Sequence, residues 1–280
     1  MVRGRLAQGE LAARVSVVIP ARNEARNLPH VLDALPPGLH EVILVDGHSV
    51  DGTIEVAQRI RPDIKIVHQA RRGKGNALAC GFAEVTGDII VTLDADGSAD
   101  PDEISAFVAA LTSGADFAKG TRFSKGGSSH DITRVRQLGN AALNALVNRL
   151  FGMDYTDLCY GYNAFHTYLI PVLDLPPANS PDMPADAMQW GDGFEIETLI
   201  NVRVAHAGAR ITEVGSTEKA RLHGVSNLHA FPDGLRVLRT VLAEYRRAAR
   251  MDRTAITDQV PVNAITDQVP VSGSLVEERS

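Results

Sequence analysis

Apolar runs rich in β-branched residues alternate with segments of helical periodicity over residues 14–116. Short apolar runs bounded by turn residues are typical of buried strands. The pattern predicts strands over residues 15–20, 41–46, 63–68 and 88–94, and helices over residues 25–35, 53–60, 76–85 and 101–113. Strands that alternate with helices form parallel sheets, and such sheets bind ligands at the carboxyl ends of their strands. We therefore expect an α/β domain with a binding site at that edge.

The alternation loosens beyond residue 117. Helices are predicted over residues 132–151, 194–207 and 231–250, and a strand over residues 209–214. A segment rich in Tyr and Asn covers residues 158–165, and the proline-rich loop 174–190 is typical of a lid or an insertion. We expect a single domain over residues 14–250 after an N-terminal extension (1–13). Residues 251–280 contain the octapeptide AITDQVPV twice, and their polar composition predicts a disordered tail.

Charge and cysteine content narrow the class of protein. The formal net charge is −6, which argues against a nucleic-acid partner, whereas residues 203–253 are locally basic and favour an anionic partner. Cys80 and Cys159 lack the spacing of metal ligands and indicate free thiols in a reducing compartment. Because the sequence also lacks a secretory signal and a long apolar run, we expect a cytoplasmic protein.

Candidate chemistry begins with Asp94-Ala95-Asp96-Gly97, which follows the fourth predicted strand. Two carboxylates spaced in this way on a strand-end loop can both face one divalent cation, and Mg²⁺ or Mn²⁺ prefers oxygen ligands. The alternative is a solvated turn. An EF-hand is excluded because its loop would require Gly at residue 99 and Glu at residue 105. The chain also lacks a Walker loop and a dinucleotide fingerprint, so the kinase and dehydrogenase hypotheses lose their main support.

Three other strand-end loops carry polar residues. Asp46 ends the second strand, where its carboxylate could accept hydrogen bonds from a base or a ribose, whereas the nearby Asp51 is best explained as a helix cap. The segment PARNE (20–24) ends the first strand in the same way. The segment GKGNA (73–77) opens a helix with glycines, which could let a ligand approach the backbone. These loops would meet at one edge of the sheet.

Together these segments resemble glycosyltransferase family 2. The motifs that carry the resemblance are SVVIPARNE (16–24), EVILVDGHSVDGT (41–53), GKGNALACGF (73–82), TGDIIVTLDADGSADP (86–101) and GTRF (120–123). The segments DLCYGYNAF (157–165), GDGFEIETL (191–199) and RLHGVSNL (221–228) resemble polyprenyl-phosphate sugar synthases of the dolichyl-phosphate mannose or glucose synthase type. The resemblance implies the GT-A fold, a Rossmann-like and mostly parallel sheet flanked by helices. Residues 14–123 would then form the nucleotide-sugar half and residues 124–250 the acceptor half.

The resemblance also implies roles for individual residues. Asp96, Arg122 and Arg221 would be catalytic, and Asp94 and Asp96 would hold Mg²⁺ or Mn²⁺ on the diphosphate, with Ser98 nearby. Pro20, Arg22 and Glu24 would border the base, Asp46 would bind the nucleoside, Arg72 and Ala77 would lie near the base or ribose, and Arg122, Arg221 and Ser226 would face the phosphates or the acceptor. Two departures from the family pattern are Gly47, in place of a second acid, and Asn227, in place of a basic residue.

The expected activity is the inverting, metal-dependent transfer of a hexose from UDP-glucose or GDP-mannose to a polyprenyl phosphate, with peripheral contact to an anionic membrane at its cytosolic face. A phosphate monoester is largely dianionic at neutral pH and needs no strong base. A soluble acceptor, such as a phosphoglycerate-like acid or a glycan or protein hydroxyl, is the alternative; a hydroxyl would need Asp192, Glu195 or Glu197 as base. A non-catalytic nucleotide-sugar-binding protein is the third hypothesis.

Overall fold

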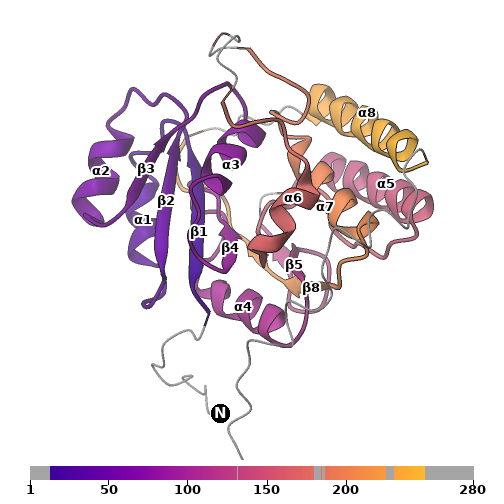
Figure 1. Ribbon diagram of the computed structural model, residues 1–280, viewed down its shortest axis with the longest axis horizontal. Coiled ribbons are helices and arrows are strands. Elements are labelled where there is room, and N and C mark those ends of the chain that lie inside the picture. Colours follow the sequence, from indigo (N-terminus) through magenta and orange to yellow (C-terminus); the bar gives the residue numbers. More distant parts are fainter. Residues whose placement is uncertain (1–12, 131, 180–183, 185–186, 225–229, 250–280) are drawn as a thin grey trace, which may run out of the picture.

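The computed structural model describes residues 13–249 except 131, 180–183, 185–186 and 225–229, so the predicted tail lies outside the described residues. A seven-stranded mixed sheet forms the centre, in the order β3-β2-β1-β4-β7-β5-β8 (Figure 1). Its strands are β1 (Val15–Ala21), β2 (Glu41–Asp46), β3 (Lys65–His68), β4 (Ile89–Thr92), β5 (Phe117–Thr121), β7 (Asn163–His166) and β8 (Ile211–Gly215). A separate two-stranded sheet pairs β6 (Ser128–Ser129) with β9 (Thr217–Glu218).

The four predicted strands of the first half are confirmed as β1 to β4, which run parallel to one another. Side chains of β1 alternate between the two faces: Val17 and Ile19 pack in one apolar cluster, and Val18 packs in the other. Helices α1 (Leu28–Asp33), α2 (Thr53–Ile60) and α4 (Ile104–Thr112) supply buried residues on the first face, and α3 (Lys74–Phe82), α6 (Ile170–Leu173) and α7 (Ile196–His206) supply them on the second. The layers are therefore helix, sheet, helix.

Several predicted helix boundaries are wrong by a few residues. Helix α1 starts at Leu28 rather than at residue 25, with Pro29 in its first turn, where proline is tolerated because the first N–H groups have no partner in the helix. The predicted helix 101–113 begins as a 3₁₀ turn, η1 (Pro101–Glu103), before α4. A second 3₁₀ turn, η2 (Thr167–Leu169), precedes α6.

The sequence pattern did not predict strands β5 and β7. β7 lies within the Tyr- and Asn-rich segment and runs antiparallel to both β4 and β5, so it interrupts the parallel sheet. β5 has the sequence FAKGT, in which the fully buried Lys119 breaks the apolar run. The Lys119 ammonium donates hydrogen bonds to the carbonyl oxygens of Gly120 (2.8 Å) and Tyr160 (2.6 Å). Buried polar residues therefore hid these strands from a pattern based on apolar periodicity.

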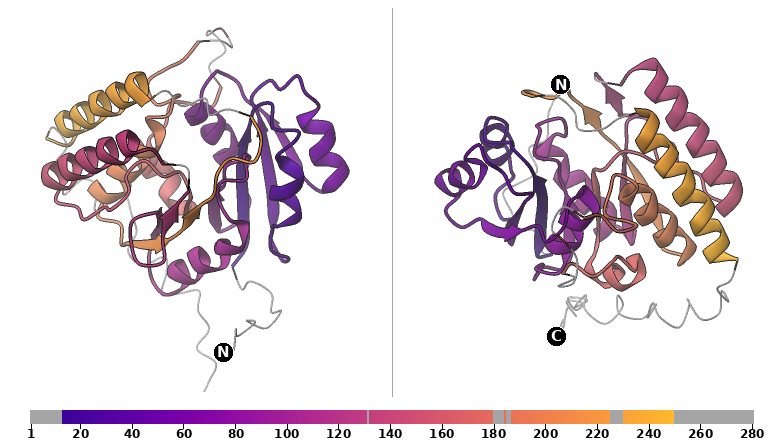
Figure 2. Two further views of the ribbon diagram at one scale, coloured as in Figure 1. Left: turned by 180° about the vertical axis from the view of Figure 1, so that it is seen from behind. Right: turned by 90° about the horizontal axis from the view of Figure 1, so that it is seen from above.

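Helices α5 (Arg134–Phe151) and α8 (Ala230–Ala248) lie side by side at the end of the molecule away from α2 (Figures 1 and 2). Together with α7 they enclose a third apolar cluster, whose members include Val147, Val202 and Val241. In the described ranges, no helix has both the length and the apolar character needed to cross a bilayer.

Candidate active site

A cavity of about 1540 Å³ opens at the carboxyl ends of β1, β2 and β4, as expected for a sheet of this kind. Its lining joins residues that are far apart in the sequence, from Pro20 after β1 to Leu238 on α8. Most of the predicted site residues line it: Pro20, Arg22, Glu24, Arg72, Ala77, Asp94, Asp96, Ser98, Arg122 and Arg221. Asp46 is not among the lining residues, and Ser226 and Asn227 lie outside the described residues.

The acidic pair lies at the centre of this cavity, in the loop after β4. Asp94 is partly exposed, and one of its carboxylate oxygens, Oδ1, lies 2.7 Å from the Nζ atom of Lys74. Asp96 Oδ1 accepts a hydrogen bond from the backbone N–H of Ser98 (2.9 Å), and Asp96 Oδ2 lies 3.4 Å from Nη2 of Arg221. Each carboxylate is therefore positioned by a cation on another element.

Lys74 links the acidic pair to α7. Its ammonium lies 2.9 Å from Glu197 Oε1, so one cation bridges Asp94 and Glu197. Burial lowers the pKa of Lys74, but the charges of the two carboxylates outweigh this effect and raise the pKa well above its ordinary value. A Cβ atom at Gly161 would lie 2.6 Å from Glu197 Oε1 and 2.7 Å from Lys74 Nζ, so a side chain at this position would displace the ends of these two side chains.

Arg221 links the acidic pair to the end of β1. Its Nη1 atom donates a hydrogen bond to Glu24 Oε1 (2.9 Å), and Asn27 donates to the other oxygen of Glu24 (2.5 Å) and to the carbonyl oxygen of His223 (3.1 Å). Burial raises the pKa of Glu24, although Asn27 and Arg221 act in the opposite direction. The segment that carries Arg221 therefore contacts both the end of β1 and the loop after β4, which carries the two aspartates.

At the ends of β2 and β3, Gly47, His48 and Gln69 line the cavity, and Asp46 lies next to them without lining it. Asp46 is buried, and both of its carboxylate oxygens accept the backbone N–H of Ser49 (3.3 and 3.2 Å), so it shapes this loop; its contact with a nucleoside stays a prediction. A Cβ atom at Gly47 would lie 2.8 Å from Gln69 Oε1. The carboxamide of Gln69 thus occupies the space beside residue 47, where the family pattern has a second acid.

The glycines of the GKG segment have a different role from the expected one. A Cβ atom at Gly73 would lie 2.0 Å from the carbonyl oxygen of Asp192, and one at Gly75 would lie 1.8 Å from that of Gly191. The backbone of residues 191–192 therefore packs against these glycines, in the space expected for a ligand. A fully buried ion pair holds it there, because Arg71 donates to both carboxylate oxygens of Asp192 at 2.9 Å.

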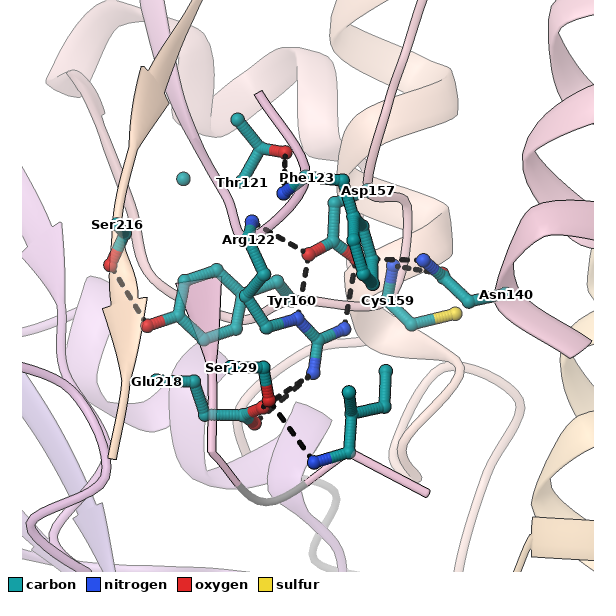
Figure 3. Close-up of polar contacts among 12 residues, drawn as sticks. Thr121, Arg122, Phe123, Ser129, Asn140, Asp157, Cys159, Tyr160, Ser216 and Glu218 are labelled. Carbon is teal, nitrogen blue, oxygen red and sulfur yellow. Dashed lines mark hydrogen bonds and ion pairs between the residues drawn. The ribbon is translucent and has the colours of Figure 1, made fainter. Parts of the chain in front are cut away.

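Arg122 lines the cavity and lies in a network of buried charges with Asp157 and Glu218 (Figure 3). Its guanidinium donates to both oxygens of Asp157 (2.7 and 2.9 Å) and to both oxygens of Glu218 (3.1 and 3.0 Å). The Tyr160 ring stacks against it, with its centroid 5.0 Å from Cζ. Burial lowers the pKa of Arg122, but the two carboxylates raise it further than burial lowers it. The guanidinium is thus fixed, and its contact with a phosphate or an acceptor stays a prediction.

Sequence analysis assigned no role to several residues that build this site. Lys74 lies inside the GKG motif and Asp157 inside DLCYGY, so both belong to a motif but have no predicted role of their own. Glu218, on β9, belongs to no predicted motif. A charged residue among glycines or aromatics was the available signal for the first two. For Glu218 the sequence offered none, because its partner Arg122 is 96 residues away.

The two aspartates fit a divalent cation as part of a ligand set. Their oxygens are hard donors and face the same cavity, which suits Mg²⁺ or Mn²⁺. The described part of the chain contains no group of three or more His, Cys, Asp or Glu residues that could hold a metal ion. Further ligands would therefore come from water or from the phosphates of a bound nucleotide.

Solved structures with a similar fold include glucosyl-3-phosphoglycerate synthase from Mycobacterium tuberculosis in complex with Mn²⁺, UDP and glucosyl-3-phosphoglycerate. The TM-score is 0.63 at 22% sequence identity, and the match covers 86% of this chain and 82% of that chain. This similarity confirms the predicted GT-A fold. The fold class of the protein is therefore the GT-A fold.

A family model described as Glycosyl transferase family 2 matches residues 16–170. The chain belongs to this family. Its relatives include polyprenol monophosphomannose synthase from Mycolicibacterium smegmatis, 29% identical over 86% of this chain and 89% of the relative. Undecaprenyl-phosphate mannosyltransferase from Micrococcus luteus is 30% identical over 77% of this chain and 87% of the relative. An uncharacterized glycosyltransferase from Mycobacterium tuberculosis is 40% identical over 76% of this chain and 89% of the relative. The family resemblance inferred from the motifs is confirmed.

Proposed function

We propose that this glycosyltransferase transfers a hexose from a nucleoside diphosphate sugar to a polyprenyl phosphate, with inversion and with Mg²⁺ or Mn²⁺. The observation that carries the proposal is the cavity itself, which joins the charged strand-end loops to a side formed by α5 and α8. Arg22, Asp94 and Asp96 line it at the strand ends, whereas on the α5–α8 side Leu143 and Leu235 line it together with Arg136 and Arg236. A polar donor and a lipid acceptor need such a two-sided site.

Asp94 and Asp96 would hold the cation, which supplies charge stabilisation for the departing diphosphate when it is bound. Arg221 lies next to this position and would add a second positive charge on the leaving group, since its guanidinium already contacts Asp96. Inversion requires the acceptor to attack from the side opposite the diphosphate. The α5–α8 side of the cavity offers that approach.

The surroundings of the three candidate bases favour a phosphate acceptor over a hydroxyl. Asp192 is held by Arg71, and Glu197 is held by Lys74. Glu195 Oε1 accepts the backbone N–H groups of Gly191 (3.1 Å) and Gly193 (3.2 Å). All three carboxylates are therefore engaged in positioning contacts. An ionised phosphate needs none of them as a base.

The outer surface of α5 and α8 supports the proposal of peripheral contact with an anionic membrane. Exposed apolar side chains on these helices are Val135, Leu138, Leu235, Leu242 and Tyr245. Exposed arginines, Arg134, Arg239 and Arg246, lie on the same two helices. Apolar residues with neighbouring basic ones suit the interface of an anionic bilayer. Such contact would bring a membrane-resident acceptor to the α5–α8 side of the cavity.

The test is transfer with Mn²⁺ or Mg²⁺ from UDP-glucose, UDP-galactose, GDP-mannose and GDP-glucose, each offered with a short polyprenyl phosphate and, separately, with 3-phosphoglycerate. We expect sugar to enter the organic phase from one donor. Asp96→Asn should lower that rate by at least 100-fold, whereas Asp63→Asn, at an exposed surface ion pair, should leave it unchanged. Transfer to phosphoglycerate alone would refute the lipid acceptor, and full activity of the Asp96 variant would refute the role of the acidic pair.

A further inference from the structure

The bridge formed by Lys74 places a protein cation on a carboxylate that is expected to bind metal. Nζ of Lys74 lies 2.7 Å from Asp94 and 2.9 Å from Glu197, and the three side chains converge from α3, the loop after β4, and α7. The lysine side chain is 15% exposed and that of Glu197 is 7% exposed. The Asp94 side chain is 39% exposed, so water screens its contact with the ammonium more than it screens the contact between the ammonium and Glu197.

A divalent cation at Asp94 would meet this ammonium at close range. Like charges a few ångströms apart in a partly buried site repel each other, so the lysine and the metal compete for the same carboxylate. Glu197 gives the lysine a second partner on the other side. The ammonium can therefore leave Asp94 without becoming an unpaired buried charge, which would be costly.

We propose that Lys74 is an internal counter-ion that occupies Asp94 in the donor-free protein and makes metal binding depend on the nucleotide. The inference rests on the proposed metal-dependent function. The protein offers two carboxylates, and each lies beside a cation of the protein, Asp94 beside Lys74 at 2.7 Å and Asp96 beside Arg221 at 3.4 Å. The metal ion alone therefore binds weakly, and Lys74 contributes the closer of the two competing contacts. A nucleoside diphosphate brings the missing oxygen ligands and the negative charge that offsets the lysine. Metal and nucleotide then each raise the affinity for the other by the same factor, as linkage requires.

The glycine at position 161 supports this role. Its missing side chain leaves the space in which the ammonium and Glu197 Oε1 lie, at 2.7 and 2.6 Å from an ideal Cβ position. The chain around Lys74 is also fixed independently of the ion pair, since the backbone of Gly75 donates to the carbonyl oxygen of Asp192 at 2.7 Å. The lysine thus has a defined place between its two partners.

The experiment measures Mn²⁺ binding by electron paramagnetic resonance of the unbound ion, with no sugar donor and then with UDP or GDP. The main variant is Lys74→Met combined with Glu197→Gln, which removes the bridge without leaving a buried carboxylate unpaired. We expect this double variant to bind Mn²⁺ alone about tenfold more tightly than the wild type, a difference of roughly 1.4 kcal/mol. The nucleotide should then enhance Mn²⁺ binding less in the variant than in the wild type.

Three controls make the outcome specific. Lys74→Arg keeps the charge and should bind Mn²⁺ as the wild type does. Lys65→Met removes a half-exposed lysine paired with Glu84 and should have no effect. Adding Asp94→Asn to the double variant should abolish the gain. Unchanged Mn²⁺ affinity in a folded double variant would overturn the proposal. Failure of the proposed function would show differently, as absence of transfer from every donor, and would leave this Mn²⁺ comparison intact.

Discussion

The sheet is packed in two different ways along its width. Around β1 the buried side chains are almost all apolar, and Val17, Val18 and Ile19 are completely inaccessible to solvent. Around β5 the buried side chains include those of Lys119, Arg122 and Asp157. Shortening a buried apolar side chain costs the transfer free energy of the atoms removed and a term for the cavity left behind, whereas a buried charge that loses its partner stays behind unpaired. The two regions should therefore respond differently to single substitutions.

Arg122→Met is expected to produce the largest effect. It removes the common partner of Asp157 and Glu218 and leaves two buried carboxylates without their cation. We expect a loss of about 3–5 kcal/mol in the free energy of unfolding, measured by urea titration. In the apolar region, Ile19→Val should cost only about 1 kcal/mol. Equal losses for the two variants would contradict the comparison.

A matched surface pair tests whether burial is the cause. Arg14 and Asp88 form an ion pair whose side chains are both about half exposed. Arg14→Met should therefore lower the free energy of unfolding far less than Arg122→Met does, since exposed pairs contribute little. A loss as large as that of Arg122→Met would show that the charge itself, rather than its burial, sets the cost.

The second region also depends on a ladder of asparagines, and Asn144→Ala is the next test. Asn140, Asn144 and Asn148 lie four residues apart on α5 and bond to residues 155–159. Asn144 donates to the carbonyl oxygen of Thr156 (2.5 Å) and accepts the N–H of Leu158 (2.8 Å). Its removal leaves both backbone groups unpaired, so we expect a loss of about 2 kcal/mol in urea titrations. Gln137→Ala, at an exposed position of the same helix, should change stability little.

The same contrast explains what the sequence could predict. The parallel strands of the first half, the fold family and the acidic pair were predicted because apolar periodicity and short motifs are local signals. β5 was missed because Lys119 interrupts its apolar run, and β7 because two tyrosines, a glycine and Asn163 surround its start. The four-residue spacing of the asparagines on α5 is visible in the sequence, but it does not indicate which residues they bond to. Contacts such as that of Arg122 with Glu218 depend on the tertiary structure, and no periodicity in the sequence indicates them.

A smaller effect is expected at the outer surface of α8. If its exposed leucines enter an anionic bilayer, replacing Leu235 and Leu242 by serine should lower binding to phosphatidylglycerol-containing vesicles about tenfold, because each leucine contributes apolar area. Val50→Ser serves as the control, since Val50 is 90% exposed on a loop of the other half. Co-sedimentation with vesicles measures the binding of the leucine variant and of the control. Equal losses for the two variants, or no loss in either, would remove α8 from the proposed membrane contact.

The smallest effect concerns pH, and it distinguishes the two edges of the sheet. At the carboxyl edge, burial raises the pKa of Glu24 despite Asn27 and Arg221. At the amino edge, burial would raise the pKa of Glu41, but hydrogen bonds from Ser16 and Thr86 lower it below its usual range. The first carboxyl is therefore held in a less favourable environment for its charge than the second.

The sign of the pH dependence follows from proton binding. Between the unfolded pKa of Glu24, about 4.3, and its higher folded value, the folded state binds more protons, so stability falls as pH rises. For Glu41 the folded pKa is the lower one, so its contribution is present above about pH 4.3 and is lost as pH falls through the folded pKa. In urea titrations across this range, Glu24→Gln should remove part of the decline toward neutral pH, and Glu41→Gln part of the loss in acid. The opposite assignment of the two slopes would show that the carboxyl edge does not disfavour the charge of Glu24.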